Sequence, residues 1–368
     1  MKKQLKIIIS GGGTGGHIFP AVAIANEIKR QRPDTEILFV GALGKMEMEK
    51  VPKAGYNIVG LPIAGFNRSN MLANFSFPVK LIKSLLKAYS VLKNFKPDMA
   101  IGVGGFASGP TLRMANFLGI KTLIQEQNSY AGVTNKILSK KAQKVCVAYP
   151  DMGKFFPNEK IVFTGNPVRS DLIDSKIDSG EARKHFGLEP DRKTLLIVGG
   201  SLGALSVNKS IAAGLQQLLN LDIQIIWQTG KTFIDQAKEK VGNLQTSRVY
   251  VSDFIYEMDQ AYAAADIVIS RAGALSVSEL SLVAKPAILV PYPFAAEDHQ
   301  TQNALSLSSK NAAVLIKDSE LNEKLMDTVS ELVANKEKLS DLSENIKKFA
   351  KPLAAKEIVD QIFSITDK

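Results

Sequence analysis

Strand-like and helix-like patterns alternate along the whole chain, and the alternation restarts near its middle. The first series of apolar runs begins with LKIIIS at residues 5–10, and the second begins with KTLLIVGG at residues 193–200. Strands that are linked by helices form parallel sheets. A fresh series of strands favours two domains over one large doubly wound sheet. We therefore predict an α/β protein made of two Rossmann-like domains that face each other across a cleft.

Both series open on a strand that runs into a glycine-rich turn and then a helix. The turns are GGGTGGH at residues 11–17 and GGSLGA at residues 199–204. Glycine lets the backbone approach a ligand closely, and the helix start that follows favours a phosphate. The first turn also fits a dinucleotide fingerprint, but that fold needs an acidic residue at the end of the second strand. Here EILFVGALG ends in Gly41, Ala42 and Leu43. Phosphate or sugar recognition is therefore favoured over dinucleotide binding.

The overall composition excludes several classes of protein. The single cysteine, Cys146, cannot form an internal disulfide, and no apolar run is long enough to cross a membrane. The N-terminus lacks the pattern of a signal peptide, so we expect a cytoplasmic location. A net charge of +10 predicts an anionic partner, but no nucleic-acid-binding module is recognisable. We therefore expect no nucleic acid among the partners.

Further loops rich in glycine or polar residues follow the predicted strands, where ligands bind in parallel sheets. They are GVGGFASGP at 102–110, QEQNSYAG at 125–132, SRAGALSVSEL at 270–280 and FAAEDHQTQNA at 294–304. In the third of these, Glu279 lies one turn into a helix, where its carboxylate could accept bonds from ribose hydroxyls. Alternatively, Glu279 favours the helix dipole and Gln300 is an ordinary first-turn residue. Their joint placement at strand ends favours a ligand site.

Seven motifs spread over nearly the whole chain resemble glycosyltransferase family 28, whose bacterial members add N-acetylglucosamine to lipid I in peptidoglycan synthesis. They are GGTGGH at 12–17, GGFASGP at 104–110, QEQN at 125–128, GNPVR at 165–169, GGSLGA at 199–204, SRAGALSVSEL at 270–280 and HQTQNA at 299–304. The resemblance implies a GT-B fold. It also implies an acceptor and membrane-contact domain at residues 1–164, a UDP-sugar domain at 165–345, and a C-terminal helix at 346–368 that packs back on the first domain.

The resemblance also implies a donor, UDP-N-acetylglucosamine, and an acceptor, lipid I. Ile255 would meet the uracil through its backbone, Glu279 would bind the ribose, and Gln300 and Asn128 would contact the amino sugar. The remaining residues of the donor and phosphate site would be Thr14, Gly15, Gly16, Arg169, Ser201, Ala274, Leu275 and Ser276. Three positions depart from the family pattern. Gln125 occupies a position where the family pattern often has a histidine, Phe106 one that often has a tyrosine, and Leu202 one that often has a glutamine. Neither Gln125 nor Phe106 can therefore carry an essential proton.

The expected reaction is direct displacement at the anomeric carbon, with inversion, by the C4 hydroxyl of the N-acetylmuramyl unit. A histidine can accept the hydroxyl proton near neutral pH. Of the three histidines, only His17 lies in a glycine loop of the expected acceptor domain. His17 is therefore the predicted base, with Glu126 in reserve, although His17 could instead cap the helix or bond a neighbouring carbonyl.

No cofactor and no obligatory metal are expected, because no two aspartates lie two positions apart and no His or Cys cluster exists. Helix N-termini and Arg169 would stabilise the leaving diphosphate instead.

The segment 74–96 has the pattern of a cationic amphipathic helix, which can lie in an anionic membrane interface. The predicted membrane contacts are Phe75, Val79, Lys80, Ile82, Lys83 and Leu85. Together with the family resemblance, they predict a peripheral protein at the cytoplasmic face of the inner membrane. The alternative is a packed helix whose lysines face water.

Two alternative functions stay open at this point. A different UDP-sugar enzyme of the same architecture, such as an epimerase or a soluble-acceptor transferase, would not need the basic apolar helix. A nucleotide-sugar-binding protein without turnover would not need His17.

Overall fold

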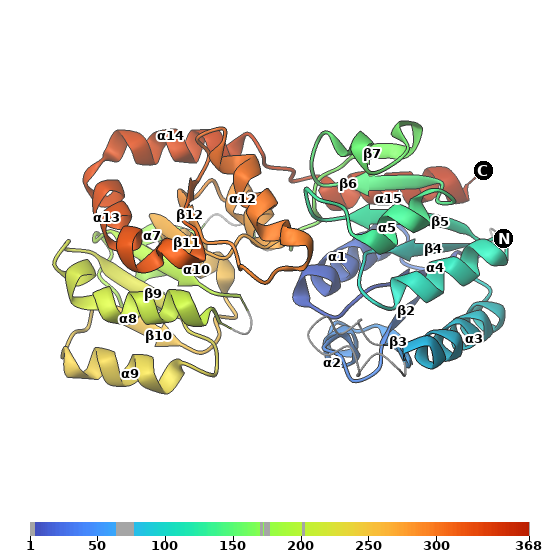
Figure 1. Cartoon of the computed structure of the whole chain (residues 1–368), viewed down its shortest axis with the longest axis horizontal. Helices are drawn as coiled ribbons and strands as arrows, with labels where there is room; N and C mark the ends of the chain where they lie inside the picture. The colour runs from blue at the N-terminus through green and yellow to red at the C-terminus, as the bar shows by residue number, and fades with distance from the viewer. Residues whose placement is uncertain (1–3, 64–76, 170–171, 173–176, 201–202, 368) are drawn as a thin grey trace. The chain divides into compact units, whose positions relative to one another are not determined.

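The structure is a computed structural model that describes residues 4–63, 77–169, 172, 177–200 and 203–367. Contacts divide the chain into two units. The first comprises Met1–Arg169 and Lys351–Lys368, and the second comprises Ser170–Ala350. Both boundaries fall slightly later in the chain than the sequence predicts. Each unit is a parallel α/β layer structure of the Rossmann type, as the alternating pattern predicts (Figure 1).

Within the described part of the first unit, the strands form one seven-stranded parallel sheet in the order β3-β2-β1-β4-β5-β6-β7. The strands are β1 Lys6–Ser10, β2 Glu36–Ala42, β3 Asn57–Leu61, β4 Met99–Gly102, β5 Lys121–Glu126, β6 Lys144–Val147 and β7 Ile161–Phe163. The helices are α1 Gly15–Gln31, α2 Glu47–Lys53, α3 Phe77–Phe95, α4 Ser108–Phe117, α5 Val133–Ser139 and α15 Ala354–Thr366, with short 3₁₀ turns at Met152–Lys154 and Asn158–Lys160.

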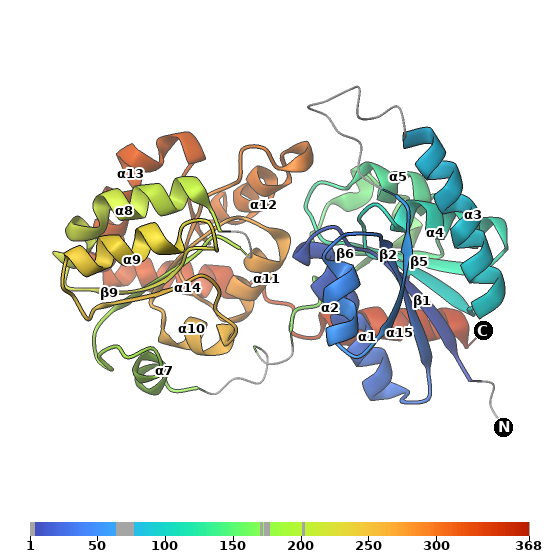
Figure 2. The same cartoon turned by 90° about the horizontal axis from the view of Figure 1, so that it is seen from below.

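Alternate residues of β1 face opposite sides of this sheet, as strand geometry requires. Ile7 and Ile9 pack with α1 and α15, whereas Ile8 packs with α3 and α4. Figure 2 shows the two helix layers on either side of the strands.

The C-terminal helix α15 belongs to the first unit. Its residues Ile358, Val359, Ile362 and Phe363 lie in the same buried cluster as the residues of α1. Arg32, just after α1, pairs with Asp367 at 2.5 Å and lies over the Phe363 ring. Residues 336–347 form a separate helix of the second unit, and Pro352, which lacks a backbone N–H, lies between the two helices.

In the second unit, the described strands form a six-stranded parallel sheet in the order β10-β9-β8-β11-β12-β13. The strands are β8 Thr194–Val198, β9 Gln224–Gln228, β10 Val249–Ser252, β11 Ile267–Ser270, β12 Ala287–Leu289 and β13 Val314–Leu315. The helices are α7 Ser179–His185, α8 Leu205–Leu219, α9 Ile234–Asn243, α10 Met258–Ala264, α11 Ala274–Leu282, α12 His299–Ser308, α13 Leu321–Ala334 and α14 Lys336–Lys347, with 3₁₀ turns at Ala296–Asp298 and Asp318–Glu320.

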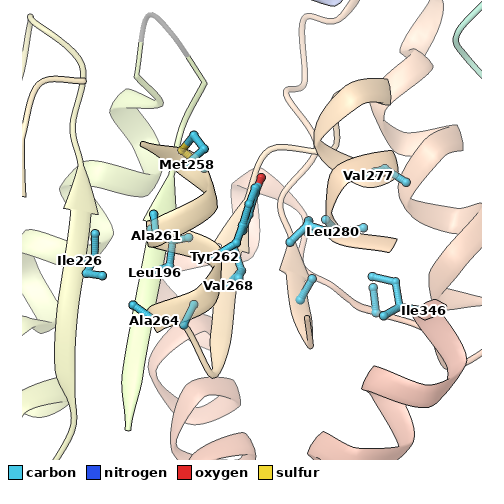
Figure 3. Packing of buried hydrophobic residues seen from close by; sticks show 14 of the residues in the cluster. Leu196, Ile226, Met258, Ala261, Tyr262, Ala264, Val268, Val277, Leu280 and Ile346 are labelled. Carbon is cyan, nitrogen blue, oxygen red and sulfur yellow. The ribbon is translucent and has the colours of Figure 1, made fainter. Parts of the chain in front are cut away.

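Two buried clusters cover the two faces of the second sheet. Leu195, Ile197 and Ile225 pack against α8, α9 and α13. Leu196, Ile226 and Val268 pack against the helices of the other face, and Figure 3 shows several of these side chains. In both sheets the glycine loops follow the carboxyl ends of β1 and β8, so each lies at the edge where parallel sheets bind ligands.

Candidate active site

The glycine loop after β1 is built around a buried carboxylate. Glu47, the first residue of α2, is only 1% exposed. Its Oε2 accepts a bond from the Gly13 N–H at 2.8 Å, and its Oε1 accepts one from the Ala42 N–H at 2.9 Å. A Cβ at Gly12 would lie 2.2 Å from the carboxyl carbon of Glu47, which explains the absence of a side chain there. The sequence analysis missed Glu47 because it looked for an acid at the end of β2 itself.

His17 lies in the first turn of α1, half-buried beside this loop. Its Nδ1 is 3.1 Å from the Gly12 carbonyl oxygen and 3.4 Å from the Thr14 hydroxyl. A carbonyl only accepts hydrogen bonds, so this contact assigns the ring proton to Nδ1. Nε2 is then the basic nitrogen, which is the form that a general base needs.

The loop after β4 lies against the first glycine loop. A Cβ at Gly105 would meet the Gly12 carbonyl oxygen at 2.2 Å, and one at Gly104 would meet His17 Nε2 at 2.8 Å. Both glycines have positive φ, of 84° and 92°, so the backbone conformation also favours glycine there. The GGFASGP motif therefore shapes the surroundings of His17 through its backbone, and Phe106 is an exposed side chain beside Gly13.

Glu126 ends β5 and holds the next loop in place. Its carboxylate accepts bonds from the Asn128 and Gly132 N–H groups and from the Asn135 side-chain amide, at 3.0, 3.1 and 2.9 Å. It is 2% exposed. This arrangement is that of a loop anchor, so the geometry favours His17 over Glu126 as the base. Asn128 is half-buried and is fixed by the same carboxylate.

Three buried amides link the QEQN and GNPVR motifs. Gln127 donates to Gln125 and to the Val103 carbonyl, Gln125 donates to Asn166 at 3.0 Å, and Asn166 donates back to the Gln127 carbonyl at 3.0 Å. Gln125, where the family pattern has a histidine, is thus part of a structural network. Arg169 follows in the same segment, with its guanidinium 5.9 Å from the centre of the Phe19 ring in α1.

In the second unit, Gln228 at the end of β9 organises the glycine loop after β8. Its Nε2 donates to the Gly200 carbonyl at 3.0 Å, and its Oε1 accepts from the Ile255 N–H at 2.9 Å. The predicted uracil contact through the Ile255 backbone would therefore require Gln228 to give up this bond if it used the N–H, but not if it used the carbonyl. Gly203 has a φ of 78°, and a Cβ there would lie 2.2 Å from the Thr229 carbonyl oxygen. Ser201 and Leu202 lie outside the described residues.

Helix α11 begins at Ala274, and its N-cap residue is Gly273, which has no side chain to cap the first turn. Leu275 and Ser276 are half-buried in this turn, which follows β11, and the first N–H groups of a helix have no partner within the helix. Such a helix start favours an anion. The predicted phosphate contacts at Ala274, Leu275 and Ser276 share this turn.

Glu279 lies one turn further along α11 and is 8% exposed. The Tyr262 hydroxyl donates to its Oε2 at 3.1 Å. In Figure 3, the Tyr262 side chain lies between the backbone of its own helix, which also carries Met258 and Ala261, and the helix that carries Val277 and Leu280. The hydroxyl of the buried Tyr262 thus fixes one carboxylate oxygen of Glu279.

An ion pair that the sequence analysis missed joins the loops at the same edge. Arg271, directly after β11, pairs with Asp318 at 2.5 Å and donates to the Ser206 hydroxyl at 2.8 Å. Its guanidinium also lies 5.5 Å from the Tyr292 ring centre. Arg271 belongs to the SRAGALSVSEL motif, but its partners Asp318 and Ser206 lie far away along the chain, so no local sequence pattern predicts these contacts.

Gln300 lies in the first turn of α12, and its Oε1 accepts a bond from the Tyr292 N–H at 2.9 Å. The residues before this helix, Glu297 and Asp298, have φ values of 52° and 54°. Non-glycine residues adopt this left-handed conformation at a cost, which is common near functional sites. The side-chain amide of Gln300 is thereby oriented by its own loop.

Helix α3 carries an unusually apolar exposed face. Ser84, Ala88 and Leu92 are buried against the unit, whereas Val79, Ile82 and Leu86 are exposed, with Ile82 at 58%. Lys80 and Lys83 are exposed beside them, and Leu85 is half-buried. Phe117, at the end of α4, is 74% exposed and lies against Tyr89 of α3. The sequence analysis missed Phe117, and Phe75 falls outside the described ranges.

The described residues contain neither a cluster of metal-ligating side chains nor a membrane-spanning helix. No group of three or more His, Cys, Asp or Glu residues among them is arranged to hold a metal ion. No described helix has the length and hydropathy needed to span a bilayer.

Comparisons with known proteins agree with the two-unit division. Residues 7–147 match the glycosyltransferase family 28 N-terminal domain, and residues 194–358 match the glycosyltransferase family 28 C-terminal domain. The UDP-N-acetylglucosamine--N-acetylmuramyl-(pentapeptide) pyrophosphoryl-undecaprenol N-acetylglucosamine transferase of Bacteroides thetaiotaomicron is 56% identical over 369 residues, which cover 100% of this chain and 99% of that protein.

Solved structures confirm the GT-B fold. The crystal structure of Acinetobacter baumannii MurG matches with a TM-score of 0.78 and 29% identity, covering 98% of this chain and 99% of that one. The UDP-GlcNAc 2-epimerase of Neisseria meningitidis, bound to UDP-GlcNAc, matches with a TM-score of 0.69 at 12% identity, covering 98% of this chain and 100% of that one. At this identity the likeness shows the fold alone. The matched domains and the full-length relative together show that the chain belongs to glycosyltransferase family 28.

Proposed function

We propose that this protein transfers N-acetylglucosamine from UDP-N-acetylglucosamine to the C4 hydroxyl of the N-acetylmuramyl unit of lipid I, giving lipid II and UDP. The observation that carries the proposal is the 56% identity, over the full length of both chains, to a transferase named for this reaction. The geometry supports it. In the first unit, His17 with its basic Nε2 follows the carboxyl edge of the sheet, and in the second unit the helix start at Ala274, which favours an anion, follows the carboxyl edge of the other sheet.

In the proposed reaction, His17 Nε2 takes the proton of the acceptor hydroxyl as its oxygen attacks the anomeric carbon. The bond from that carbon to the diphosphate oxygen breaks, and UDP leaves with the electron pair. Attack from the face opposite the leaving group inverts an α-linked donor to a β-linked product. General-base assistance of this kind contributes about 10²- to 10⁴-fold to a rate.

The second unit holds the nucleotide. Glu279 accepts bonds from the ribose hydroxyls, Ile255 meets the uracil, and Ser201 and the α11 start bind the diphosphate. Gln300 contacts the amino sugar. From the first unit, Asn128 contacts the sugar, and Thr14, Gly15, Gly16 and Arg169 complete the donor and phosphate site. The structure supports these roles by placing the described members at the carboxyl edges of their own sheets.

A helix N-terminus and a guanidinium stabilise a diphosphate without a metal ion. We therefore expect turnover to persist in a chelator. Loss of activity in EDTA that magnesium restores would contradict this part of the mechanism.

The test is to incubate the protein with UDP-N-acetylglucosamine and a soluble lipid I analogue, and to measure UDP and the disaccharide lipid together. Equal amounts of the two products support the proposal. Conversion of the donor to another UDP-sugar without acceptor would indicate an epimerase, and binding without turnover would indicate a binding protein. His185→Ala, which alters an exposed histidine of the second unit, is the matched control for His17→Ala.

The exposed face of α3 supports a peripheral membrane location, because the acceptor is a lipid. Val79, Ile82 and Leu86 would insert among the acyl chains, while Lys80 and Lys83 would meet anionic headgroups. Phe117 extends this apolar surface. We propose that this face contacts the cytoplasmic leaflet, in line with the cytoplasmic location that the sequence and the family resemblance predict.

Vesicle binding tests this part separately. Burying an exposed Ile or Leu contributes about 1.5–3 kcal/mol, so Ile82→Ser with Leu86→Ser should weaken binding to phosphatidylglycerol vesicles by roughly tenfold or more. Leu86 is changed here in place of the predicted contact Leu85, because Leu86 is the more exposed of the two. Leu353→Ser is the matched control, because Leu353 is 57% exposed on another surface. Unchanged binding by the double variant would remove the proposal.

A further inference from the structure

A carboxylate, a peptide group and an imidazole lie in series in the first unit. The peptide that joins Gly12 to Gly13 donates its N–H to Glu47 Oε2 at 2.8 Å. The carbonyl of the same peptide faces His17 Nδ1 at 3.1 Å. Glu47 and His17 are therefore connected through one peptide group.

The surrounding backbone is shaped to fit this carboxylate. A Cβ at Gly41 would lie 2.5 Å from Glu47 Cγ, and a Cβ at Gly12 would overlap the carboxyl group. The second carboxylate oxygen accepts from the Ala42 N–H at 2.9 Å, so Glu47 joins the ends of β1 and β2. On the other side, Gly105 packs directly on the Gly12 carbonyl oxygen. The Gly12–Gly13 peptide is thus held on both faces.

We propose that Glu47 is a positioning residue that acts on His17 through the Gly12–Gly13 peptide. Its negative charge polarises the peptide, because hydrogen bonds in series strengthen one another in a poorly solvated site. The Gly12 carbonyl becomes a stronger acceptor, which favours the tautomer with the proton on Nδ1. The same polarisation stabilises the imidazolium that forms when Nε2 takes a proton. This inference deepens the proposed function and rests on His17 being its base.

A buried carboxylate that merely fills space and one that sets a tautomer respond differently to substitution. In Glu47→Gln the shape is kept, but the side chain can present only one acceptor. One of the Gly13 and Ala42 N–H groups then faces a donor, and the charge is gone. The imidazole should lose its preference for the Nδ1–H form even though the fold persists.

The experiment is nitrogen NMR of protein labelled with ¹⁵N-histidine. The chain has three histidines, so the His17→Ala spectrum assigns the His17 signals by difference. We expect the unmodified protein to show Nδ1 protonated and Nε2 unprotonated at neutral pH, and Glu47→Gln to show a mixture of tautomers. A predominantly Nε2-protonated His17 in the unmodified protein would overturn the proposal whether or not the variant folds.

Kinetics supply the second readout. We expect kcat for transfer to fall about tenfold to a hundredfold in Glu47→Gln, the loss typical of a charged hydrogen bond, with KM for UDP-N-acetylglucosamine unchanged. Glu49→Gln, on the exposed side of the same helix, is the control and should match the unmodified protein. A variant that keeps both its tautomer and its kcat would sink the inference.

The two readouts also separate this inference from the proposed function. If the tautomer of His17 changes in Glu47→Gln but lipid I is not glycosylated, the positioning role of Glu47 is supported and the assigned substrate is wrong. If lipid I is glycosylated and the tautomer of His17 is the same in Glu47→Gln, the proposed function is supported and the positioning role of Glu47 is wrong.

Discussion

In the first unit the glycine loop after β1 is held by a buried carboxylate, whereas in the second unit the loop after β8 is held by a neutral amide. Both loops follow the central strand at which the strand order reverses. Glu47 accepts from Gly13 in one case, and Gln228 joins Gly200 to Ile255 in the other. A second carboxylate, Glu126, anchors the next loop of the first unit. In the second unit, the loop after β11 contains the Arg271–Asp318 ion pair.

This difference is consistent with different proposed roles for the two units, proton transfer in the first and anion binding in the second. Buried carboxylates repel a diphosphate but stabilise a positive charge that develops on a nearby histidine. In the second unit the neutral amide of Gln228 and the helix start at Ala274 form an edge that favours anions, while the Arg271 guanidinium is neutralised by Asp318. In the proposed mechanism the first unit thus supplies proton transfer and the second most of the anion binding, with Thr14, Gly15, Gly16 and Arg169 adding to the phosphate site from the first unit.

The largest expected effect is that of His17→Ala. Removing the base should lower kcat about 10²- to 10⁴-fold, while UDP binding, measured by calorimetry, stays within about twofold. His185→Ala should leave both unchanged. Near-normal turnover by His17→Ala at saturating substrates would end the assignment of proton transfer to the first unit.

A smaller effect is expected in the second unit from Glu279→Gln. A carboxylate that accepts ribose hydroxyls contributes about 1.5–3 kcal/mol, so the Kd for UDP should rise roughly tenfold to a hundredfold. Glu257→Gln, at an exposed position just before α10, is the control. Tryptophan fluorescence checks the fold, because Trp227 is buried in the second sheet. An unaltered Kd would show that the ribose is bound elsewhere.

Glu126→Gln sharpens the comparison within the first unit. The variant loses part of an acceptor set that holds Asn128 and Gly132, so the free energy of unfolding should fall by about 1–3 kcal/mol. Turnover should fall far less than in His17→Ala. If turnover falls as far while thermal stability is unchanged, Glu126 becomes the base and the anchor role is wrong.

The smallest effect concerns Cys146, whose complete burial in the first sheet raises the pKa of the thiol to about 12. Burial disfavours the charged thiolate, and the thiolate is the reactive form. At pH 8 the native protein should therefore resist iodoacetamide, whereas the unfolded protein should react fully, as mass spectrometry can show. Reaction under native conditions with Trp227 fluorescence unchanged would mean that the first unit opens independently of the second.

The sequence predicted the parts of the fold and site that depend on local pattern. Strand alternation indicated two parallel sheets, and the glycine turns indicated their ligand edges. The sequence pattern does not reveal the short strands β7 and β13, because runs of three and two residues carry little periodicity. Glu47 was missed because the dinucleotide pattern directs attention to the strand end, although Gly41, which makes room for its side chain, was a visible signal.

Other features depend on contacts between distant residues and leave no local trace. The Arg271–Asp318 pair and the link from Gln228 to Ile255 join separate loops. The resemblance supplied Ile255 and Glu279 as donor contacts, but the partners that orient them came only from the structure. The domain boundaries shifted because Ile346 and Phe349 pack in the second unit, whereas Gly165 packs against Lys351 in the first.

The placement of α15 has a consequence for the order of folding during synthesis. Ile358, Val359 and Ile362 fill one side of the first sheet, yet the ribosome makes them after every strand of both units. The second unit can thus complete its own core while the earlier unit still exposes part of β1 and α1 to water. Nascent chains halted before residue 354 should accordingly attract chaperones at the segment that was translated first.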